Sequence, residues 1–447
     1  MSSPSSVPKY PTGGRPSGPP SVQGPMGDGG VKPPAANARR SFIARNPSVL
    51  IFLLALAAFT IIVTIASEAY GVGFISTSFV KTLGKTLCLG LVALAMDLIW
   101  GYAGILSLGH MAFFALGGYM IGMWLMYART EEIVVAALAQ GGLPATPEEV
   151  RQGIATQIFG VVGSSDLPAI WSFAYSLPLQ LILAVAVPGL LAFIFGWLAF
   201  RSRVTGVYLS ILTQAMTLAL ALYLFQNDSG LRGNNGLSGL QNLPGLGDTS
   251  QDLVSVWFFW ASALALGVGY LTLAWVVSGR FGSVIRAIRD DEARVRFLGY
   301  SVEGYKLFLF TLTAIIAAIA GALYYPQAGI INPAELAPIA SIYLAVWVAI
   351  GGRGRLYGAV IGAALVSLVS SWFTSGQVPS IPLGFATIQW VDWWLVLLGA
   401  AFVGVTLFAP KGIGGLFDRF QGIATPDRKG AALGPDDGSL QEREAQE

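Results

Sequence analysis

The chain has 447 residues, of which 54% are hydrophobic and only 11% are charged, with a formal net charge of +2. Soluble domains carry about 25% charged residues, so this composition excludes a soluble globular protein and indicates a polytopic membrane protein. A single histidine, His110, and a single cysteine, Cys88, also exclude a His/Cys metal cluster and an intramolecular disulfide. We therefore expect no metal, no cofactor and no enzyme active site.

The first 48 residues differ in composition from the rest of the chain. They contain ten of the 24 prolines and many Gly and Ser residues. Such a segment cannot bury enough apolar surface to offset the entropy of ordering, so we expect a disordered tail at 1–48. The chain turns polar again near its end, which predicts a second disordered tail at 419–447 and leaves 49–418 as the transmembrane domain.

Ten apolar segments between the tails are long enough to cross a bilayer as helices. A span needs about 20 apolar residues, because every backbone polar group in the hydrocarbon must be paired within its own helix. We therefore expect an all-α polytopic membrane protein with about ten transmembrane helices. The predicted spans cover residues 49–66, 86–103, 104–127, 177–200, 204–225, 254–277, 307–325, 336–352, 356–373 and 393–410.

The distribution of positive charge orients these spans. Lys and Arg accumulate in the cytosolic loops of membrane proteins. With ten spans and both termini inside, 21 of the 26 Lys and Arg residues fall on the cytosolic side. The five that fall outside are Lys81, Lys85, Arg129, Arg151 and Arg232. This asymmetry predicts cytosolic N- and C-termini.

Two of the expected external loops are long, at 128–176 and 226–252. The first contains the sequence TPEEVRQG, which is typical of a capped helix start at Thr146, within what is otherwise a solvated insertion. The second is rich in Gly and Asn, which form tight turns and expose amide groups. That composition fits either a plain linker or a rim that meets a polar ligand or a docking protein.

Asp97 is the best-placed carboxylate within an expected span. An ionisable group there costs roughly 2.5–3.5 kcal/mol and must be paired or hydrated. Two interpretations remain open, a structural hydrogen bond to a neighbouring Tyr or Ser, and a contact with solute. The next segment, Gly101 to Tyr119, is rich in Gly, which permits either close helix packing or a broken or re-entrant helix at a pore. The candidate substrate-pathway residues are Asp97, Ser107, His110, Gln214 and Asn235.

A dense charge island at 279–306 separates two apolar spans. We expect two short helices there, the first capped by Ser283 and the second by Asp290. Val295 and Leu298 should share one apolar face of the second helix. An amphipathic loop lying at the lipid headgroups would explain this pattern, but its compactness favours a rigid cytosolic knob that inserts into a partner.

The chain itself is not expected to bind ATP. Gly84-Lys85-Thr86 matches the end of a P-loop, but Phe79 stands where the motif requires Gly. The tripeptide also opens an apolar helix rather than following a strand.

Four sequence segments, in this order, resemble one family. They are GYAGILSLGHMAFFALGGY at 101–119, the run from GRFGSVIRAIRDDEARVRFLGY to QAGIINP at 279–333, VWVAIGGRGRLYGAVIGA at 346–363 and LFAPKGIGGL at 407–416. Together they resemble the permease subunits of ABC importers for branched-chain amino acids and urea, over about residues 83–418. AIRDDEARVRFLGY and the GNNGLSGL loop are most similar to the urea branch, in its second, longer type of permease.

This resemblance implies a subunit of a larger importer in the bacterial cytoplasmic (inner) membrane. Its partners would be a second related permease subunit, two cytosolic ABC ATPases that bind the ATP, an external solute-binding protein and the lipid bilayer, and no nucleic acid. The solute would be urea or a short-chain amide, with a branched-chain amino acid as the alternative within the family. An ion-coupled secondary transporter or a channel that uses Asp97 is the alternative of another class.

The resemblance also implies that the charge island couples the permease to the ATPase. Closure of the ATPase subunits would move the cytosolic knob, and the adjoining spans would tilt between outward-open and inward-open states. Gly101 to Tyr119 would pack in the core near the pathway. The residues implied in coupling are Arg280, Arg286, Arg289, Asp290, Asp291, Glu292 and Gly299.

Overall fold

The structure is a computed structural model whose described part is helical and begins at residue 46. The tail at 1–48 therefore lies outside the described residues except for its last three, and α2 already begins at Pro47. The tail at 419–447 lies outside them completely. The described residues are 46–68, 73–140, 146–159, 168–245, 251–375, 381–382, 387–388, 390–408 and 412–415.

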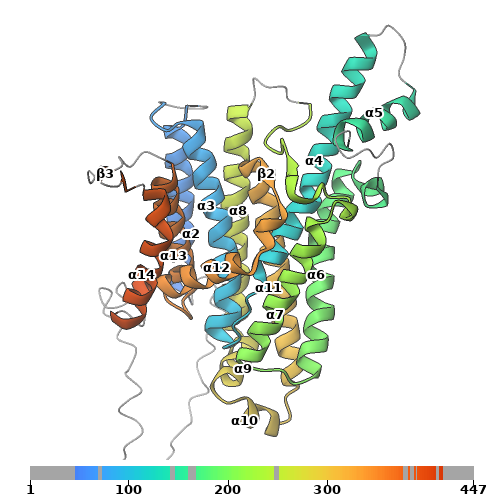
Figure 1. The fold of residues 1–447 in the computed structure, drawn as a ribbon. Coiled ribbons are helices and arrows are strands. Elements are labelled where there is room, and N and C mark those ends of the chain that lie inside the picture. Colours follow the sequence, from blue (N-terminus) through green and yellow to red (C-terminus); the bar gives the residue numbers. More distant parts are fainter. Residues whose placement is uncertain are drawn as a thin grey trace, which may run out of the picture. The chain divides into compact units, whose positions relative to one another are not determined.

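Long apolar helices dominate this part of the chain (Figure 1). They carry apolar residues on all sides, as is typical of helices that contact both lipid and other helices. These helices, together with the shorter apolar helix α12, are α2 (Pro47–Ala66), α3 (Thr77–Asp97), α4 (His110–Gln140), α6 (Leu177–Arg201), α7 (Val207–Phe225), α8 (Gln251–Ser278), α11 (Val302–Ala328), α12 (Pro338–Gly351), α13 (Leu356–Thr374) and α14 (Trp390–Phe408).

Shorter elements connect these helices. A π-helical turn extends α3, and two short helices lie between α8 and α11. The shorter elements are η1 (Leu98–Tyr102), α5 (Pro147–Phe159), η2 (Ala169–Phe173), η3 (Asn227–Ser229), η4 (Gly233–Asn235), β1 (Leu237–Ser238), α9 (Arg280–Asp290), α10 (Glu292–Phe297), β2 (Ile330–Ile331), η6 (Pro333–Leu336), β3 (Ile381–Pro382) and β4 (Thr387–Ile388).

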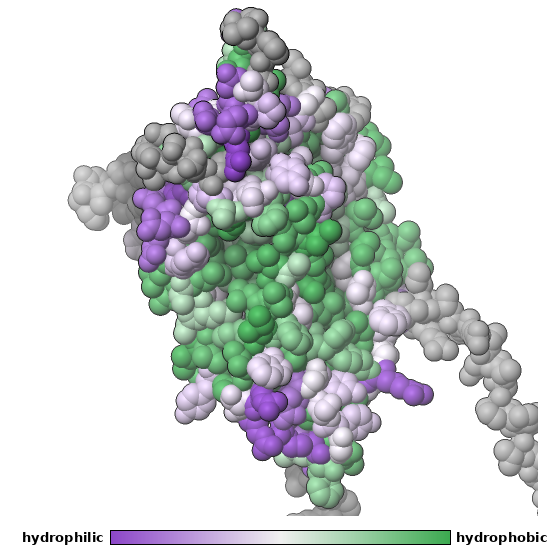
Figure 2. All heavy atoms as spheres, turned by 90° about the vertical axis from the view of Figure 1, so that its right-hand side faces the viewer, coloured by the Kyte–Doolittle hydropathy of each residue, from purple (hydrophilic) through white to green (hydrophobic). Residues whose placement is uncertain are grey.

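The all-α polytopic architecture predicted from the sequence is confirmed. Within the described residues, eight helices are long and apolar enough to cross a membrane, and two shorter apolar helices accompany them. Figure 2 shows the corresponding surface, an apolar band between polar zones at both ends. The shorter α12 rises only about 21 Å over its 14 residues. Since the hydrocarbon core is about 30 Å thick, α12 alone is too short to cross it.

The boundaries of two spans differ from the prediction. The second span begins at Thr77 rather than at residue 86, and the third begins at His110 rather than at 104. The third also continues as helix to Gln140, past the expected end at 127. Charge marks where a helix leaves the hydrocarbon, but Arg and Glu are good helix formers and do not end it.

Helices α3, α4 and α11 form the core of the helical unit. In the most apolar stretches of α3 and α4, 89% and 78% of the residues are buried, against 11% for α2. Glycines allow the backbones of α4 and α11 to touch, because a Cβ at Gly117 would overlap the Ala318 carbonyl and one at Gly321 would overlap the Phe114 carbonyl. Close helix packing therefore explains part of the glycine-rich segment.

The two long insertions, which the sequence predicts to be external, contain local structure. Thr146 caps α5 as predicted: its Oγ1 accepts a hydrogen bond from the Glu149 N–H (3.3 Å), and Glu149 Oε2 accepts one from the Thr146 N–H (2.8 Å). The Thr146 N–H and the Thr146 hydroxyl both donate to the Glu149 carboxylate and lower its pKa below the ordinary value. In the second insertion, β1 pairs antiparallel with β2, so the Gly/Asn-rich loop is fixed to the segment that follows α11.

Candidate functional site

The charge island folds into two short helices, which together with the C-cap residue Leu298 we call the α9–α10 unit (residues 280–298). Ile288 of α9, Val295 of α10 and Val302 of α11 form a small buried cluster, and Val284 and Tyr305 pack against it. This apolar seam fixes the unit to the first turn of α11. Figure 1 shows the α9–α10 unit at one end of the long helices, beyond the ends of α6 and α7.

The caps of these helices differ from the prediction. Gly279 precedes α9 without a side-chain cap, and Ser283 lies inside the helix. α10 is capped by Asp291, whose Oδ1 accepts a hydrogen bond from the Arg294 N–H (3.0 Å), and not by Asp290. Asp290 and Asp291 are adjacent, and only the one with extended backbone can act as the cap.

Arg289 connects the α9–α10 unit to the end of the second span. Its Nη1 donates a hydrogen bond to the Gly101 carbonyl of η1 (2.8 Å). The same guanidinium contacts Asp290 Oδ1 at 3.1 Å. Gly104 makes room for the Arg289 stem, since its φ is +73° and a Cβ there would lie 2.7 Å from Arg289 Cγ. A left-handed glycine and an arginine from a distant helix thus meet where η1 ends.

An ionic network ties α10 to α11. Lys306 Nζ lies 2.5 Å from Glu292 Oε2, with the lysine side chain 9% exposed. Arg296 extends the network, with contacts of 2.9 Å to Glu292 and 2.8 Å to Glu303. Breaking a partly buried pair leaves one charge without its counterion, which costs more than an exposed pair contributes. Glu292 is therefore committed to contacts within the chain.

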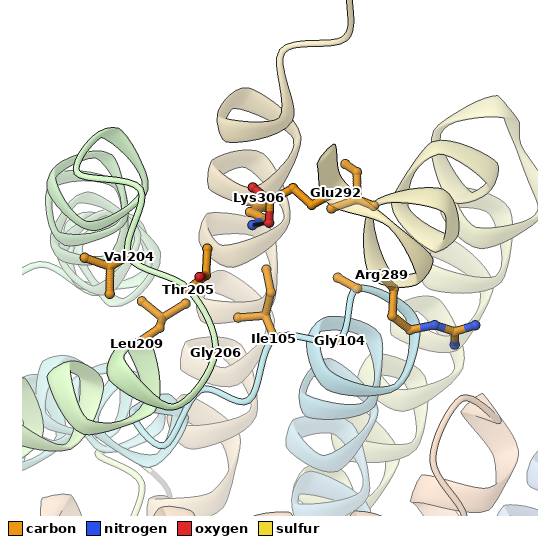
Figure 3. Close-up of a pocket in the computed structure, with 11 residues that line it drawn as sticks. Gly104, Ile105, Val204, Thr205, Gly206, Leu209, Arg289, Glu292 and Lys306 are labelled. Atoms are coloured by element: carbon orange, nitrogen blue, oxygen red, sulfur yellow. Dashed lines mark hydrogen bonds and ion pairs between the residues drawn. The ribbon is translucent and has the colours of Figure 1, made fainter. Parts of the chain in front are cut away.

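The Lys306–Glu292 pair forms one wall of a pocket of about 210 Å³ (Figure 3). Gly104 and Ile105 line the pocket from the segment after η1, and the α6–α7 loop lines it from the opposite side. The Arg289 guanidinium points away from the other labelled residues in this view. The pocket thus lies between the α9–α10 unit, the α6–α7 loop and the interruption in the core.

The free end of the α9–α10 unit is apolar. Phe297 is 91% exposed and Leu298 is 68% exposed, whereas Val295 is only 5% exposed. The prediction that Val295 and Leu298 share one face is therefore wrong. Gly299, with φ +86°, turns the chain in the left-handed conformation directly after these two residues.

The core is interrupted between η1 and α4, where residues 103–109 are not helical. The glycine-rich segment is therefore broken here. Side chains of α7 hold the interruption: Ser210 Oγ donates to the Leu106 carbonyl (2.6 Å), and the Leu108 N–H donates to Thr213 Oγ1 (3.0 Å). These bonds satisfy backbone groups that a continuous helix would have paired internally.

The structure brings Ser107 and His110 together at the start of α4. His110 Nδ1 lies 3.1 Å from Ser107 Oγ, and Nε2 lies 3.0 Å from Thr313 Oγ1 on α11. The Thr313 hydroxyl also lies 3.0 Å from the Phe310 carbonyl, which can accept its hydrogen. Both ring nitrogens thus have protein partners, and His110 joins α4 to α11.

Asp97 lies elsewhere, at the end of α3. It is 0% exposed, and its Oδ1 accepts a hydrogen bond from the Gly354 N–H (2.7 Å) in the turn between α12 and α13. Its structural partner is therefore a backbone group rather than a Tyr or Ser side chain. Gly101, one turn later, has no side chain to obstruct this contact.

The remaining predicted residues are not gathered around Ser107 and His110. Gln214 is half-buried on α7, and Asn235 is exposed in η4. Arg280 is exposed, while Arg286 Nη1 donates to the Val277 carbonyl (3.2 Å). Contact of any of these residues with solute or with an ATPase stays a prediction.

Sequence reasoning missed Phe297, Lys306 and Thr313. Phe297 and Leu298 form an apolar pair within a strongly charged stretch, and this pattern could have marked an exposed contact. Lys306 borders a long apolar run, where a cation needs a partner. Thr313 gave no local signal, because its role depends on His110 203 positions away.

A sequence model described as the permease component of the branched-chain amino acid transport system matches residues 78–406. Curated relatives match a shorter part of the chain. The Autoinducer 2 import system permease protein LsrC of Yersinia pseudotuberculosis serotype IB (strain PB1/+) is 28% identical over 145 residues, which cover 31% of this chain and 38% of that protein. The same values hold for the proteins of that name in Y. pseudotuberculosis serotype O:1b (strain IP 31758) and Yersinia pestis (strain Pestoides F). No solved structure matches the chain significantly.

Proposed function

The chain belongs to the family of permease components of the branched-chain amino acid transport system, and we propose that it is the transmembrane permease subunit of an ATP-driven importer of urea or short-chain amides. In this proposal it forms half of the translocation pathway in the bacterial cytoplasmic membrane, and the α9–α10 unit faces the cytosol. Two ABC ATPases, a second related permease subunit and an external solute-binding protein complete the importer.

The observation that carries this proposal is the α9–α10 unit with its exposed apolar end. Phe297 and Leu298 project from a unit that is fixed to α11 by an apolar cluster and by the Lys306–Glu292 pair. Exposed aromatic side chains on a rigid support are typical anchors of protein interfaces. We infer that these two residues enter a cleft of the ATPase.

The Arg289–Gly101 hydrogen bond supplies a route from this interface to the core. Displacement of α9 would pull on the end of η1, and residues 103–109 begin there. That segment is held by side chains of α7 rather than by its own helical bonds. Side-chain hydrogen bonds of this kind can be exchanged without unwinding a helix, as a switching element requires.

Two observations support an uncharged polar solute. First, the ionic network of Glu292, Arg296, Glu303 and Lys306 lies between α10 and the first turns of α11, away from the interruption at 103–109. Second, the polar groups in and around the interruption are hydroxyl, imidazole and backbone amide groups. Urea offers N–H donors and one carbonyl acceptor, which such groups can match without a fixed charge. The AIRDDEARVRFLGY and GNNGLSGL segments add the resemblance to the urea branch.

A branched-chain amino acid is the alternative solute, favoured by the description of the matching family. The partly matching relatives carry a name that refers to autoinducer 2 import, so this solute also belongs in the test. An ion-coupled secondary transporter or channel is less well supported, because Asp97 is fully buried and bound to a backbone N–H.

The test is uptake into proteoliposomes that contain the full chain, its second permease subunit and the ATPases, with the solute-binding protein outside. Labelled urea, leucine and autoinducer 2 are offered in turn, with ATP or a non-hydrolysable analogue in the ATPase compartment. We expect urea uptake with ATP only. Uptake of leucine or autoinducer 2 under the same conditions would identify that compound, instead of urea, as the solute. Uptake without ATP would refute the assignment as an ATP-driven importer.

A further inference from the structure

A pocket of about 310 Å³ lies between the start of α2, the end of α8 and the turn between α12 and α13. Two arginines, Arg286 and Arg355, line it together with Tyr102 and Tyr357, whose hydroxyl donates to the Gly414 carbonyl (3.3 Å). Arg286 is held at the wall by its hydrogen bond to the Val277 carbonyl. Guanidinium groups match the oxygens of a phosphate group, so the pocket has the chemistry of a phosphate site.

An apolar groove of about 470 Å³ follows along the same two helices. Leu53, Leu56 and Ala57 of α2 face Trp260 and Gly267 of α8 across it. The neighbouring α8 residues Tyr270 and Leu271 line the pocket and the groove respectively, so the two lie end to end along α8.

The combined length fits one leaflet of a bilayer. Val49 lines the pocket and Ile61 lines the groove, and along α2 they are separated by about 18 Å. The hydrocarbon of a single leaflet is about 15 Å thick. The outer side of α2 is exposed and apolar, with Ile51 63% exposed and Leu54 60% exposed, so the groove borders on the region that lipid occupies.

We propose that this pocket and groove bind one phospholipid with an anionic headgroup. Its phosphate lies between Arg286 and Arg355, and one acyl chain fills the groove between α2 and α8. Basic pockets between transmembrane helices are known to take anionic headgroups. The proposal concerns the helical unit alone and does not depend on the proposed transport function.

The charges around the pocket favour lipid over the segment of the chain that precedes α2. That segment contains Arg39, Arg40 and Arg45, which the two pocket arginines would repel. Asp97 interacts electrostatically with Arg355, but it is fully buried and already accepts the Gly354 N–H. It therefore does not occupy the anion position.

A bound lipid would hold α2, which is the least buried of the long apolar helices, against α8. Between the pocket and the groove, Phe52 stacks on Tyr270 with ring centroids 3.9 Å apart. The lipid would add contacts on both sides of this stack. Because Arg286 belongs to α9, the headgroup would also join α2 to the α9–α10 unit.

The first test measures lipid retained by the purified full chain. The protein is exposed to mixed micelles of phosphatidylglycerol and phosphatidylcholine, and bound lipids are counted by native mass spectrometry. We expect preferential retention of phosphatidylglycerol and a higher melting temperature with it. Arg286→Gln should weaken retention about fivefold, the factor expected for one arginine near an anionic lipid. Arg151→Gln on α5 removes the same charge far from the pocket and should change nothing.

The second test addresses the acyl chain. Gly267→Leu fills the groove, and its Cβ would meet Leu56 Cδ2 at an ordinary contact distance of 3.5 Å, so the protein should still fold. We expect loss of the retained lipid. Gly399→Leu on α14 is the matched control, because a Cβ at position 399 has no other atom within 4 Å.

Three results would overturn the proposal. Equal retention of phosphatidylglycerol and phosphatidylcholine would contradict a site that selects an anionic headgroup. The same rise in melting temperature with inorganic phosphate alone, unaffected by Gly267→Leu, would indicate a site for a free anion. Retention of phosphatidylglycerol only after deletion of residues 1–45 would show that the preceding chain occupies the pocket.

Discussion

Arg289 of α9 donates a hydrogen bond to the carbonyl of Gly101, 188 positions earlier in the chain, over 2.8 Å. This bond joins the α9–α10 unit to the point where the second span loses its helical structure. Gly104 lies directly beside the arginine stem, and a left-handed backbone places it there. The side chain of Arg289 thus connects the α9–α10 unit to the interruption at 103–109 in the core of the transmembrane helices.

Removing this connection should impair transport more than folding. Arg289→Ala deletes a charge-assisted bond at a partly exposed site, which lowers the free energy of unfolding by about 1–2 kcal/mol. ATP-driven uptake per folded protein should fall at least about tenfold, a barrier increase of about 1.4 kcal/mol. Arg294→Ala, on the same unit but with a side chain 79% exposed, serves as the control. Equal uptake by the two variants would rule out the proposed route through Gly101.

Gly104→Ala should destabilise the protein for two separable reasons. The left-handed backbone costs about 1–2 kcal/mol for a residue with a Cβ, and the new methyl group meets Arg289 Cγ at 2.7 Å. Thermal unfolding of Gly104→Ala with and without Arg289→Ala separates these effects, because truncating the arginine relieves only the steric part. Gly399→Ala, in open space, should leave the melting temperature almost unchanged. Purely additive effects in the double variant would contradict the contact between Gly104 and Arg289.

Lys306→Met should be destabilising, and Glu292→Gln should rescue part of the loss. The single change leaves Glu292 with Arg296 as its remaining cation, and loss of the charge-assisted bond to Lys306 costs about 1–3 kcal/mol. Denaturant unfolding of both single variants and the double variant measures the coupling between the two residues. Arg129→Met breaks a more exposed pair with Glu132, which contributes only about 0–1 kcal/mol. A coupling energy no larger than that of the Arg129–Glu132 pair would mean that Lys306 does not hold α10.

Asp97→Asn should preserve both folded protein and ATP-driven uptake. The asparagine Oδ1 can still accept the Gly354 N–H, whereas Asp97→Leu leaves that buried donor unpaired at a cost of about 1–3 kcal/mol. Yield of folded protein and uptake in proteoliposomes distinguish the variants. Loss of uptake in Asp97→Asn with normal folding would instead support an ion relay at this carboxylate.

The spans could be predicted from the sequence because each is a long apolar run, and such a run has no stable alternative to a helix in lipid. The break at 103–109 could be suspected from its glycines, but its position depends on Ser210 and Thr213, about one hundred residues further along. The cap of α10 could not be chosen locally, since Asp290 and Asp291 are adjacent and of equal chemistry.

The candidate site was predictable only in part. Ser107 and His110 were recognised as polar residues in an apolar stretch, but their partner Thr313 lies on another helix and carries no sequence signal. Six of the seven residues implied in coupling are charged, whereas the most exposed large side chain of the α9–α10 unit is Phe297. The sequence prediction selected charged residues because they are the most common in this segment. It could not distinguish the exposed Phe297 and Leu298 from the buried Val295, because the burial of each depends on packing against α11.

The affinity of the ATPase subunit for the full chain in nanodiscs tests the central claim most directly. Phe297→Ser with Leu298→Ser removes the exposed apolar end without touching the buried cluster behind it, and loss of an interface anchor should weaken association about thirtyfold or more. Phe74→Ser, at a residue 83% exposed before α3, provides the matched control and should bind like the unaltered chain. Unchanged affinity in the double variant would contradict the docking of the ATPase on the α9–α10 unit.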